Sequence, residues 1–82
     1  MELKDTVKLM ESDNYKERFK AEYFQLKTRI ERLYNLLNRN ADDNIDGSPR
    51  KLLIRQYNIM NNYLYILMCR ADCEGINIME VE

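Results

Sequence analysis

Residues 19–37 read FKAEYFQLKTRIERLYNLL, and the apolar residues of this stretch recur every three or four positions. Because an α-helix has 3.6 residues per turn, this spacing places them on one stripe of a helix. The stripe consists of Phe19, Tyr23, Leu26, Ile30, Leu33 and Leu37. We therefore predict a helix over about 14–39, with its N-cap at Asn14, Ser12 or Asp13.

A second stripe with the same spacing follows a polar stretch. It consists of Leu53, Tyr57, Met60, Leu64, Leu67 and Ala71. Ser48 and Pro49 are preferred residue types at an N-cap and at the first helical position, and Gly75 is typical just beyond a helix end. These signals predict a second helix over about 48–74.

The remaining segments are short. Leu3, Val7 and Met10 share one face of a predicted helix over about 2–11. A loop at 40–47, with a turn at Asp46-Gly47, joins the long helices, and a short tail covers 75–82. The predicted fold is a single all-α domain, residues 1–82, that combines a short N-terminal helix with a long antiparallel helical hairpin.

The chain has only 82 residues, so its own core is thin. The second long helix also carries a further apolar row with seven-residue spacing: Leu52, Ile59, Ile66 and Cys73. One facing helix cannot cover both stripes, so either the N-terminal segment or another subunit must help. We expect a homo-oligomer, with the tail extended and packed on a partner subunit.

Charge is divided along the chain. The segments 14–39 and 49–70 each carry a net charge of +4, whereas 1–13, 40–48 and 71–82 carry −2, −3 and −4. Two basic helices are thus separated and flanked by acidic segments. This pattern concerns the choice of partner and does not determine the fold.

Composition argues against an enzyme. The chain has no His, and its two Cys, Cys69 and Cys73, cannot complete a metal site by themselves. Its two Gly are too few for a phosphate-binding glycine loop. No His is present to activate a nucleophile. We expect no cofactor and no metal. No apolar run approaches the roughly 20 residues of a membrane span, and no signal peptide is evident.

The first turn of the second long helix holds the most unusual cations. Arg50 and Lys51 lie where the helix dipole favours acidic residues or a bound anion. Two explanations stay open at this point. The loop acids (Asp42, Asp43 and Asp46) could compensate these cations, or a phosphate group could do so.

Further cations alternate with aromatic residues. Lys16 and Lys20 share one flank of the first long helix, and Arg55 follows Lys51 on the second. Tyr15 and Tyr23 could stack a nucleobase beside such cations, although a tyrosine on a helix stripe usually serves packing. The acidic ends and a pI near 5.5 disfavour long-duplex nucleic acid, and a small anion suits the charge better.

The stretch YKERFKAEYFQLK (15–27), with YLYIL (63–67) and RADCEGI (70–76), resembles a family of small, mostly uncharacterised proteins encoded by phages and prophages. The overall architecture is similar to the phage helical-hairpin sponges. Those proteins oligomerise and sequester cyclic nucleotides or cyclic ADP-ribose isomers made by the CBASS and Thoeris defence systems. The resemblance implies a location in the cytoplasm of a bacterial host.

Two functional hypotheses follow. In the first, the chain is a non-enzymatic sponge for a nucleotide-derived immune signal. Lys16, Lys20, Arg50, Lys51 and Arg55 would then meet phosphates, and Tyr15 or Tyr23 would stack the base. In the second, the chain is an anti-CRISPR-like inhibitor that binds a host defence protein through its acidic loop and acidic C-terminal residues.

Overall fold

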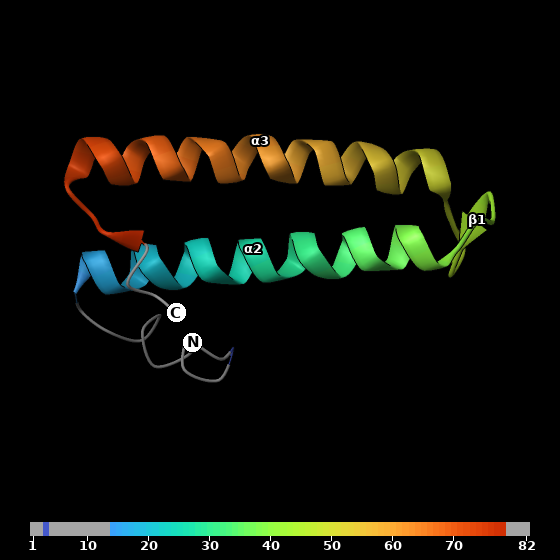
Figure 1. Cartoon of the computed structure of the whole chain (residues 1–82), viewed down its shortest axis with the longest axis horizontal. Coiled ribbons are helices and arrows are strands. Elements are labelled where there is room, and N and C mark those ends of the chain that lie inside the picture. Colours follow the sequence, from blue (N-terminus) through green and yellow to red (C-terminus); the bar gives the residue numbers. More distant parts are fainter. Residues whose placement is uncertain (1–2, 4–13, 79–82) are drawn as a thin grey trace.

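In the computed structural model, which describes residue 3 and residues 14–78, two helices of 25 residues each lie antiparallel (Figure 1). Helix α2 spans Tyr15–Arg39 and helix α3 spans Arg50–Glu74. Between them, strands β1 (Asn44–Ile45) and β2 (Ser48–Pro49) form a small antiparallel ladder. The predicted helical hairpin is confirmed, whereas the helix expected over 2–11 lies, apart from Leu3, outside the described residues.

Helix α2 begins at a polar cap. The Asn14 side-chain oxygen accepts hydrogen bonds from the backbone N–H groups of Lys16 and Glu17, at 2.9 and 3.3 Å. These bonds satisfy two of the N–H groups that a helix start leaves without an intrahelical partner. Of the three N-cap candidates in the sequence, Asn14 is therefore the residue used.

The start of α3 differs from the prediction. The helix begins at Arg50, two residues later than expected, and its cap residue Pro49 provides no side-chain hydrogen bond. Ser48 is not the N-cap because it lies in β2, where it pairs with Ile45. The strand pairing takes precedence because it satisfies local backbone groups, and the Arg50 N–H then donates to the Asp43 carbonyl.

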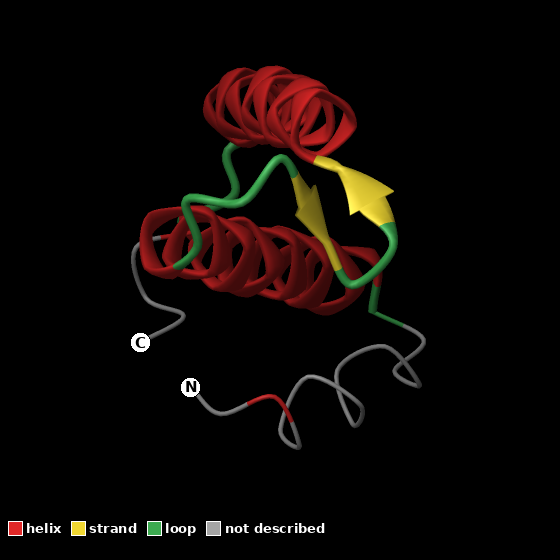
Figure 2. Ribbon diagram, turned by 90° about the vertical axis from the view of Figure 1, so that its right-hand side faces the viewer, coloured by secondary structure: helices red, strands yellow, loops and turns green. Residues whose placement is uncertain are grey.

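The turn between the strands is the predicted one. Asp46 and Gly47 have φ values of 52° and 86°, and two consecutive positive φ angles characterise the tight two-residue turn of a β-hairpin. Figure 1 shows this hairpin at one end of the molecule, and Figure 2, which faces that end, shows each long helix as one layer. We call this end the closed end, and the end that holds Tyr15 and Glu74 the open end.

The end of α3 is also as predicted. Gly75 has φ 70° and ψ 30°, the left-handed conformation that glycine adopts readily. The Ile76 N–H donates to the Ala71 carbonyl at 2.8 Å, which closes the last turn. The chain then turns back toward α2, which places Ile76 over the inner face of the hairpin.

The core lies between the two stripes and is tightest near the open end. Its buried cluster consists of Phe19, Tyr23, Leu67, Ala71 and Ile76. All twelve stripe positions predicted from the sequence are buried or half-buried. Ile76 is only 5% exposed and packs in this cluster of its own chain, and the packing of the tail on a partner subunit stays a prediction.

Candidate functional site

The predicted cations form two groups at opposite ends of the hairpin. Arg50, Lys51 and Arg55 lie on the first turns of α3 at the closed end, while Lys16 and Lys20 lie on the first turns of α2 at the open end. At 1.5 Å per helical residue, the groups are roughly 30 Å apart along the long axis. A single chain therefore does not bring all five cations to one ligand.

Arg50 has a structural partner that neither explanation from the sequence anticipated. Its guanidinium donates to the Leu37 carbonyl at 3.1 Å and also to the Asn40 carbonyl. These oxygens belong to the C-terminal end of α2, where free carbonyls and the negative end of the helix dipole favour a cation. Because the helices are antiparallel, the start of α3 lies beside the end of α2. The Arg50 side chain, which is unfavourable at the start of α3, is therefore favourable at the end of α2.

Lys51 and Arg55 remain open to solvent. Both side chains are exposed, and neither forms an ion pair with any residue of 14–78. Lys51 borders a hollow of about 630 Å³ lined also by Asp43, Asn44, Pro49, Arg50 and Ile54. Arg55 borders a second, more apolar hollow of about 520 Å³, lined by Leu52, Gln56, Ile59 and Met60. These two cations can meet an incoming anion without first breaking a contact.

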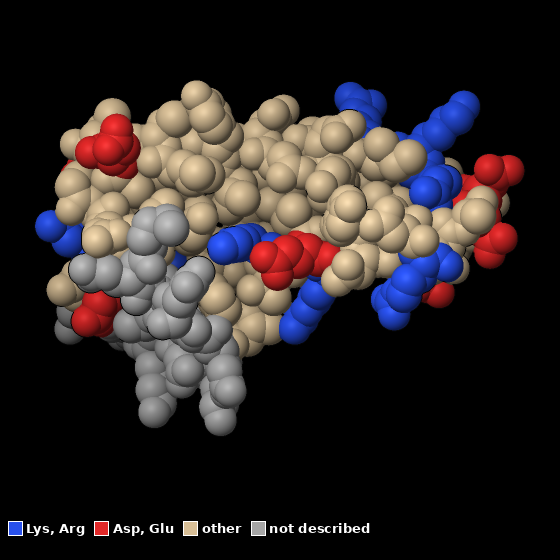
Figure 3. Space-filling model, viewed as in Figure 1, with Lys and Arg blue, Asp and Glu red and all other residues tan. Residues whose placement is uncertain are grey.

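The surface of the closed end is correspondingly charged. In Figure 3, basic and acidic side chains gather at this end, whereas the visible face of α3 is mostly uncharged along its length. Asp42, Asp43 and Asp46 are exposed in the same region as Lys51. Exposed side chains of both charges therefore lie in one region of the surface.

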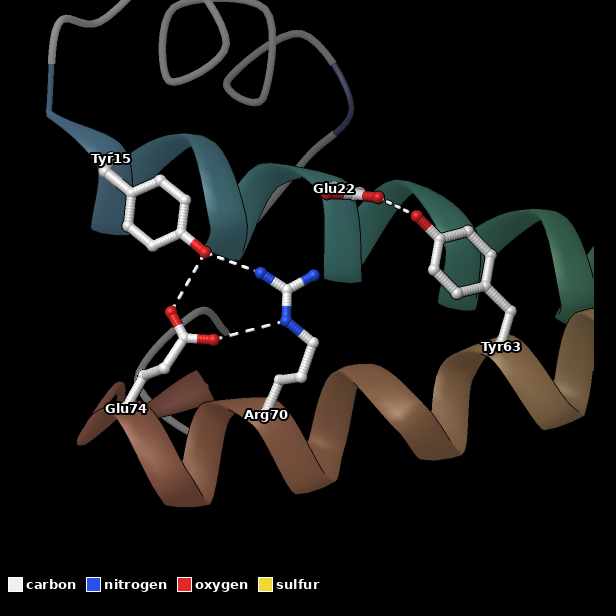
Figure 4. Close-up of polar contacts among 5 residues, drawn as sticks. All are labelled: Tyr15, Glu22, Tyr63, Arg70 and Glu74. Atoms are coloured by element: carbon white, nitrogen blue, oxygen red, sulfur yellow. Dashed lines mark hydrogen bonds and ion pairs between the residues drawn. The ribbon is translucent and has the colours of Figure 1, made fainter.

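At the open end, hydrogen bonds connect the two helices (Figure 4). Arg70 donates to the Tyr15 hydroxyl at 2.6 Å and to Glu74 at 3.2 Å, and the Tyr15 hydroxyl donates to Glu74 at 2.9 Å. The hydrogen bond to Glu74 raises the pKa of the Tyr15 hydroxyl. Arg70 also lies over the Phe19 ring, 5.2 Å from its centroid. The Tyr15 hydroxyl is thus already engaged within the chain.

A second polar link lies about two helical turns closer to the middle of the hairpin. The Tyr63 hydroxyl donates to the Glu22 carboxylate, and this hydrogen bond raises the pKa of Tyr63. The sequence analysis missed both links. The four-residue spacing of Arg70 and Glu74 is a recognisable ion-pair signal, but the partners on α2 follow only from the register of the two helices.

The other predicted residues differ in availability. Lys16 is exposed and Lys20 is half-buried. The Tyr15 ring is 46% exposed, whereas Tyr23 is 8% exposed and belongs to the buried cluster. In this conformation Tyr23 therefore packs in the core, as a tyrosine on a helix stripe usually does. Of the two tyrosines, Tyr15 is the more accessible.

Within residues 14–78, no group of three His, Cys, Asp or Glu side chains is arranged to hold a metal ion. Cys69 and Cys73 are both free and exposed. None of the helices of the described part of the chain has the length and apolar character needed to cross a membrane.

A comparison with known protein families identifies a match over most of the chain. The model of a protein family described as Sequestin matches residues 13–73, a range that includes both long helices almost completely. Neither the curated proteins nor the solved structures contain a significant match to the chain.

Proposed function

The chain belongs to the Sequestin family, and we propose that it is a phage counter-defence protein that binds and holds a nucleotide-derived immune signal without cleaving it. The family name refers to sequestration, which supports a binding function over a catalytic one. The proposed ligand class is a cyclic oligonucleotide or a cyclic ADP-ribose derivative, and the proposed place of action is the cytoplasm of a bacterial host.

The observation that carries this proposal is the pair of exposed cations, Lys51 and Arg55, beside open hollows at the closed end. Phosphate oxygens accept hydrogen bonds from both side-chain types, and the adjoining apolar side chains of Leu52 and Ile54 can contact a base or ribose. Arg50 supports this site by fixing the start of α3 to the end of α2.

The experiment is a binding measurement by calorimetry against a panel of cyclic dinucleotides, cyclic trinucleotides and cyclic ADP-ribose isomers. We expect at least one ligand to bind the wild type and to be recovered intact by chromatography. The double variant Lys51→Ala/Arg55→Ala should lose most of this affinity, because each charge-assisted hydrogen bond contributes about 1.5–3 kcal/mol.

The matched control is Arg29→Ala/Arg32→Ala, which removes the same charge from exposed positions of α2. A general charge effect would weaken binding equally in both double variants and would contradict the assigned site. A third variant, Lys16→Ala/Lys20→Ala, tests the open-end cations in the same way. Absence of binding to the whole panel would contradict the proposed ligand class.

A second candidate function uses the acidic residues at the same end. Asp42, Asp43 and Asp46 are all exposed, as required for an inhibitor that covers a basic groove on a host defence protein. The triple variant Asp42→Asn/Asp43→Asn/Asp46→Asn would then abolish inhibition of that protein, while Lys51→Ala/Arg55→Ala would leave it unchanged. If the chain is a sponge, Lys51→Ala/Arg55→Ala should instead abolish its activity, and the triple Asp→Asn variant should leave it unchanged.

A further inference from the structure

An aromatic pair joins α2 and α3 in the closed half of the hairpin. The rings of Tyr34 on α2 and Tyr57 on α3 are 6.0 Å apart between centroids, with an angle of 29° between their planes. Rings in such a stacked arrangement attract each other. Within residue 3 and residues 14–78, neither hydroxyl of the pair has a hydrogen-bond partner. The pair is therefore held by contact between its rings and not by its polar groups.

One ring of the pair is open on its other side. Tyr34 is 50% exposed although Tyr57 lies against one face of its ring, whereas Tyr57 itself is half-buried. The exposed part of Tyr34 therefore includes the ring face that is turned away from Tyr57. An aromatic face that is open to solvent can stack a nucleobase, because every base has a π-face. Contact with Tyr57 holds the Tyr34 ring in place before a ligand arrives, which lowers the entropic cost of binding.

The pair lies beside the larger hollow of the closed end. Arg50, Ile54 and Tyr57 follow one another at intervals of four and three residues, so they lie on one face of α3. Arg50 and Ile54 line the hollow of about 630 Å³. On α2, the Leu37 carbonyl that accepts a hydrogen bond from Arg50 lies about one helical turn after Tyr34. Both helices therefore place the aromatic pair next to this hollow.

The tyrosines predicted from the sequence to stack a base are poorly placed for this hollow. Tyr15 lies 19 positions before Tyr34, which is roughly 28 Å along α2. The Tyr15 hydroxyl also accepts a hydrogen bond from Arg70, and Tyr23 is only 8% exposed. Tyr34 thus combines the position that Tyr15 lacks with the exposure that Tyr23 lacks.

We propose that Tyr34 is the base-stacking residue of the closed-end site. The nucleobase lies on the open face of the Tyr34 ring, the ribose contacts Ile54, and a phosphate accepts hydrogen bonds from Lys51. Lys51 and Tyr57 are six positions apart, so about 9 Å along α3 separates the cation from the aromatic pair. The flexible lysine side chain adjusts to the phosphate, while the stacked ring fixes the base. This inference rests on the proposed function and gives its ligand a nucleobase that is bound by stacking.

The test uses two probes that differ in the base. Adenosine monophosphate (AMP) carries base, ribose and phosphate, and ribose phosphate lacks the base. Binding of each probe to the full-length chain is followed by proton NMR, in which stacking on an aromatic ring moves the adenine proton signals upfield. We expect the wild type to bind AMP more tightly than ribose phosphate by roughly five- to one-hundred-fold, the effect of one stacked base. The adenine signals of bound AMP should also show the upfield shift.

Three variants assign the stacking to one residue. Tyr34→Ala should lower the affinity for AMP to that for ribose phosphate and abolish the upfield shift. Tyr34→Phe should keep both, because stacking needs the ring and not the hydroxyl. The matched control is Tyr15→Ala, which removes a tyrosine of similar exposure, 46%, from the same helix and should leave AMP binding unchanged. Circular dichroism checks that all three variants keep their helices.

Equal affinity of the wild type for AMP and ribose phosphate, or no binding of either, would overturn the assigned stacking. A loss of AMP binding in Tyr15→Ala that Tyr34→Ala does not share would overturn it as well. These outcomes are distinct from failure of the proposed function. If AMP stacks on Tyr34 but no member of the cyclic nucleotide panel binds, the stacking residue stands and the sponge function fails. If a panel member binds the wild type and Tyr34→Ala equally, the sponge function stands and the stacking residue is wrong.

Discussion

Helices α2 and α3 have equal lengths and equivalent inner stripes, but their other faces differ. Helix α2 carries ten charged residues and exposes two large hydrophobic residues, Tyr15 and Tyr34. Helix α3 carries six charged residues and exposes seven large hydrophobic residues. The difference shows that the outer side of α2 is mostly charged, whereas the outer side of α3 exposes more apolar side chains.

The largest expected effect tests whether the inner stripe of α3 carries the stability of the hairpin. Leu67 is fully buried, so Leu67→Ala should lower the free energy of unfolding by about 2–5 kcal/mol. Its sequence neighbour Met68 is 46% exposed, and Met68→Ala should stay within about 0.5 kcal/mol of the wild type. Urea unfolding monitored by circular dichroism measures both values, and equal losses would contradict the division of α3 into inner and outer faces.

The next effect concerns the end of α3. Gly75 has a positive φ and its Cβ position is free of neighbours, so Gly75→Ala would introduce backbone strain without a steric clash. We expect a loss of roughly 1–2 kcal/mol. Gly75→Asn should lose less, because asparagine tolerates the left-handed conformation better. If the two variants lose the same stability in thermal unfolding, the left-handed backbone conformation of Gly75 is not the cause of that loss.

A smaller effect distinguishes the two helix starts. Asn14→Ala removes both side-chain cap bonds of α2 and should cost about 1 kcal/mol. Ser48→Ala should change little, because Ser48 lies in β2 and does not cap α3. Chemical unfolding of the two variants gives a direct comparison. A loss at Ser48 as large as that at Asn14 would show that Ser48 has a capping role after all.

The smallest effect is the pH dependence of the link between α2 and α3. The hydrogen bond to Glu22 raises the folded-state pKa of Tyr63. The stabilisation of the fold by this hydrogen bond is therefore fully present below the unfolded-state pKa of about 10. The contribution is lost as pH rises through the folded-state value. Unfolding measured near neutral pH and again above about pH 10 should therefore show a smaller alkaline loss for Tyr63→Phe than for the wild type. An equal loss in both proteins would exclude the Tyr63–Glu22 hydrogen bond as a source of the alkaline loss of stability.

The hairpin was predictable because its signals are local. Stripe spacing, the Asn14 cap, the Asp46-Gly47 turn and the Gly75 terminus each depend on residues close together in the sequence. The start of α3 was mispredicted because Ser48 and Pro49 are preferred residue types at a helix start, and the sequence does not show that β1 is available to pair with them.

The candidate site was predictable only in part. The sequence identifies Lys51 and Arg55 as cations without a nearby acidic residue on α3, and both prove accessible. It does not reveal that Arg50 binds the end of α2, or that Tyr15 reaches Arg70, because both contacts depend on the register between distant segments. Burial of Tyr23 likewise follows from which face of α2 meets α3.

The position of the core at the open end has a consequence for the folding route. Tyr15 and Glu74 are separated by 59 positions in the chain, whereas the β1–β2 turn joins immediate neighbours. Each doubling of a closing loop adds about 0.6 kcal/mol of entropic cost, so assembly that begins at the turn and proceeds along the helices avoids closing the longest loop in one step. On this route we expect the buried cluster of Phe19, Tyr23, Leu67, Ala71 and Ile76 to form after the closed end, and to fix the start of α2 to the end of α3.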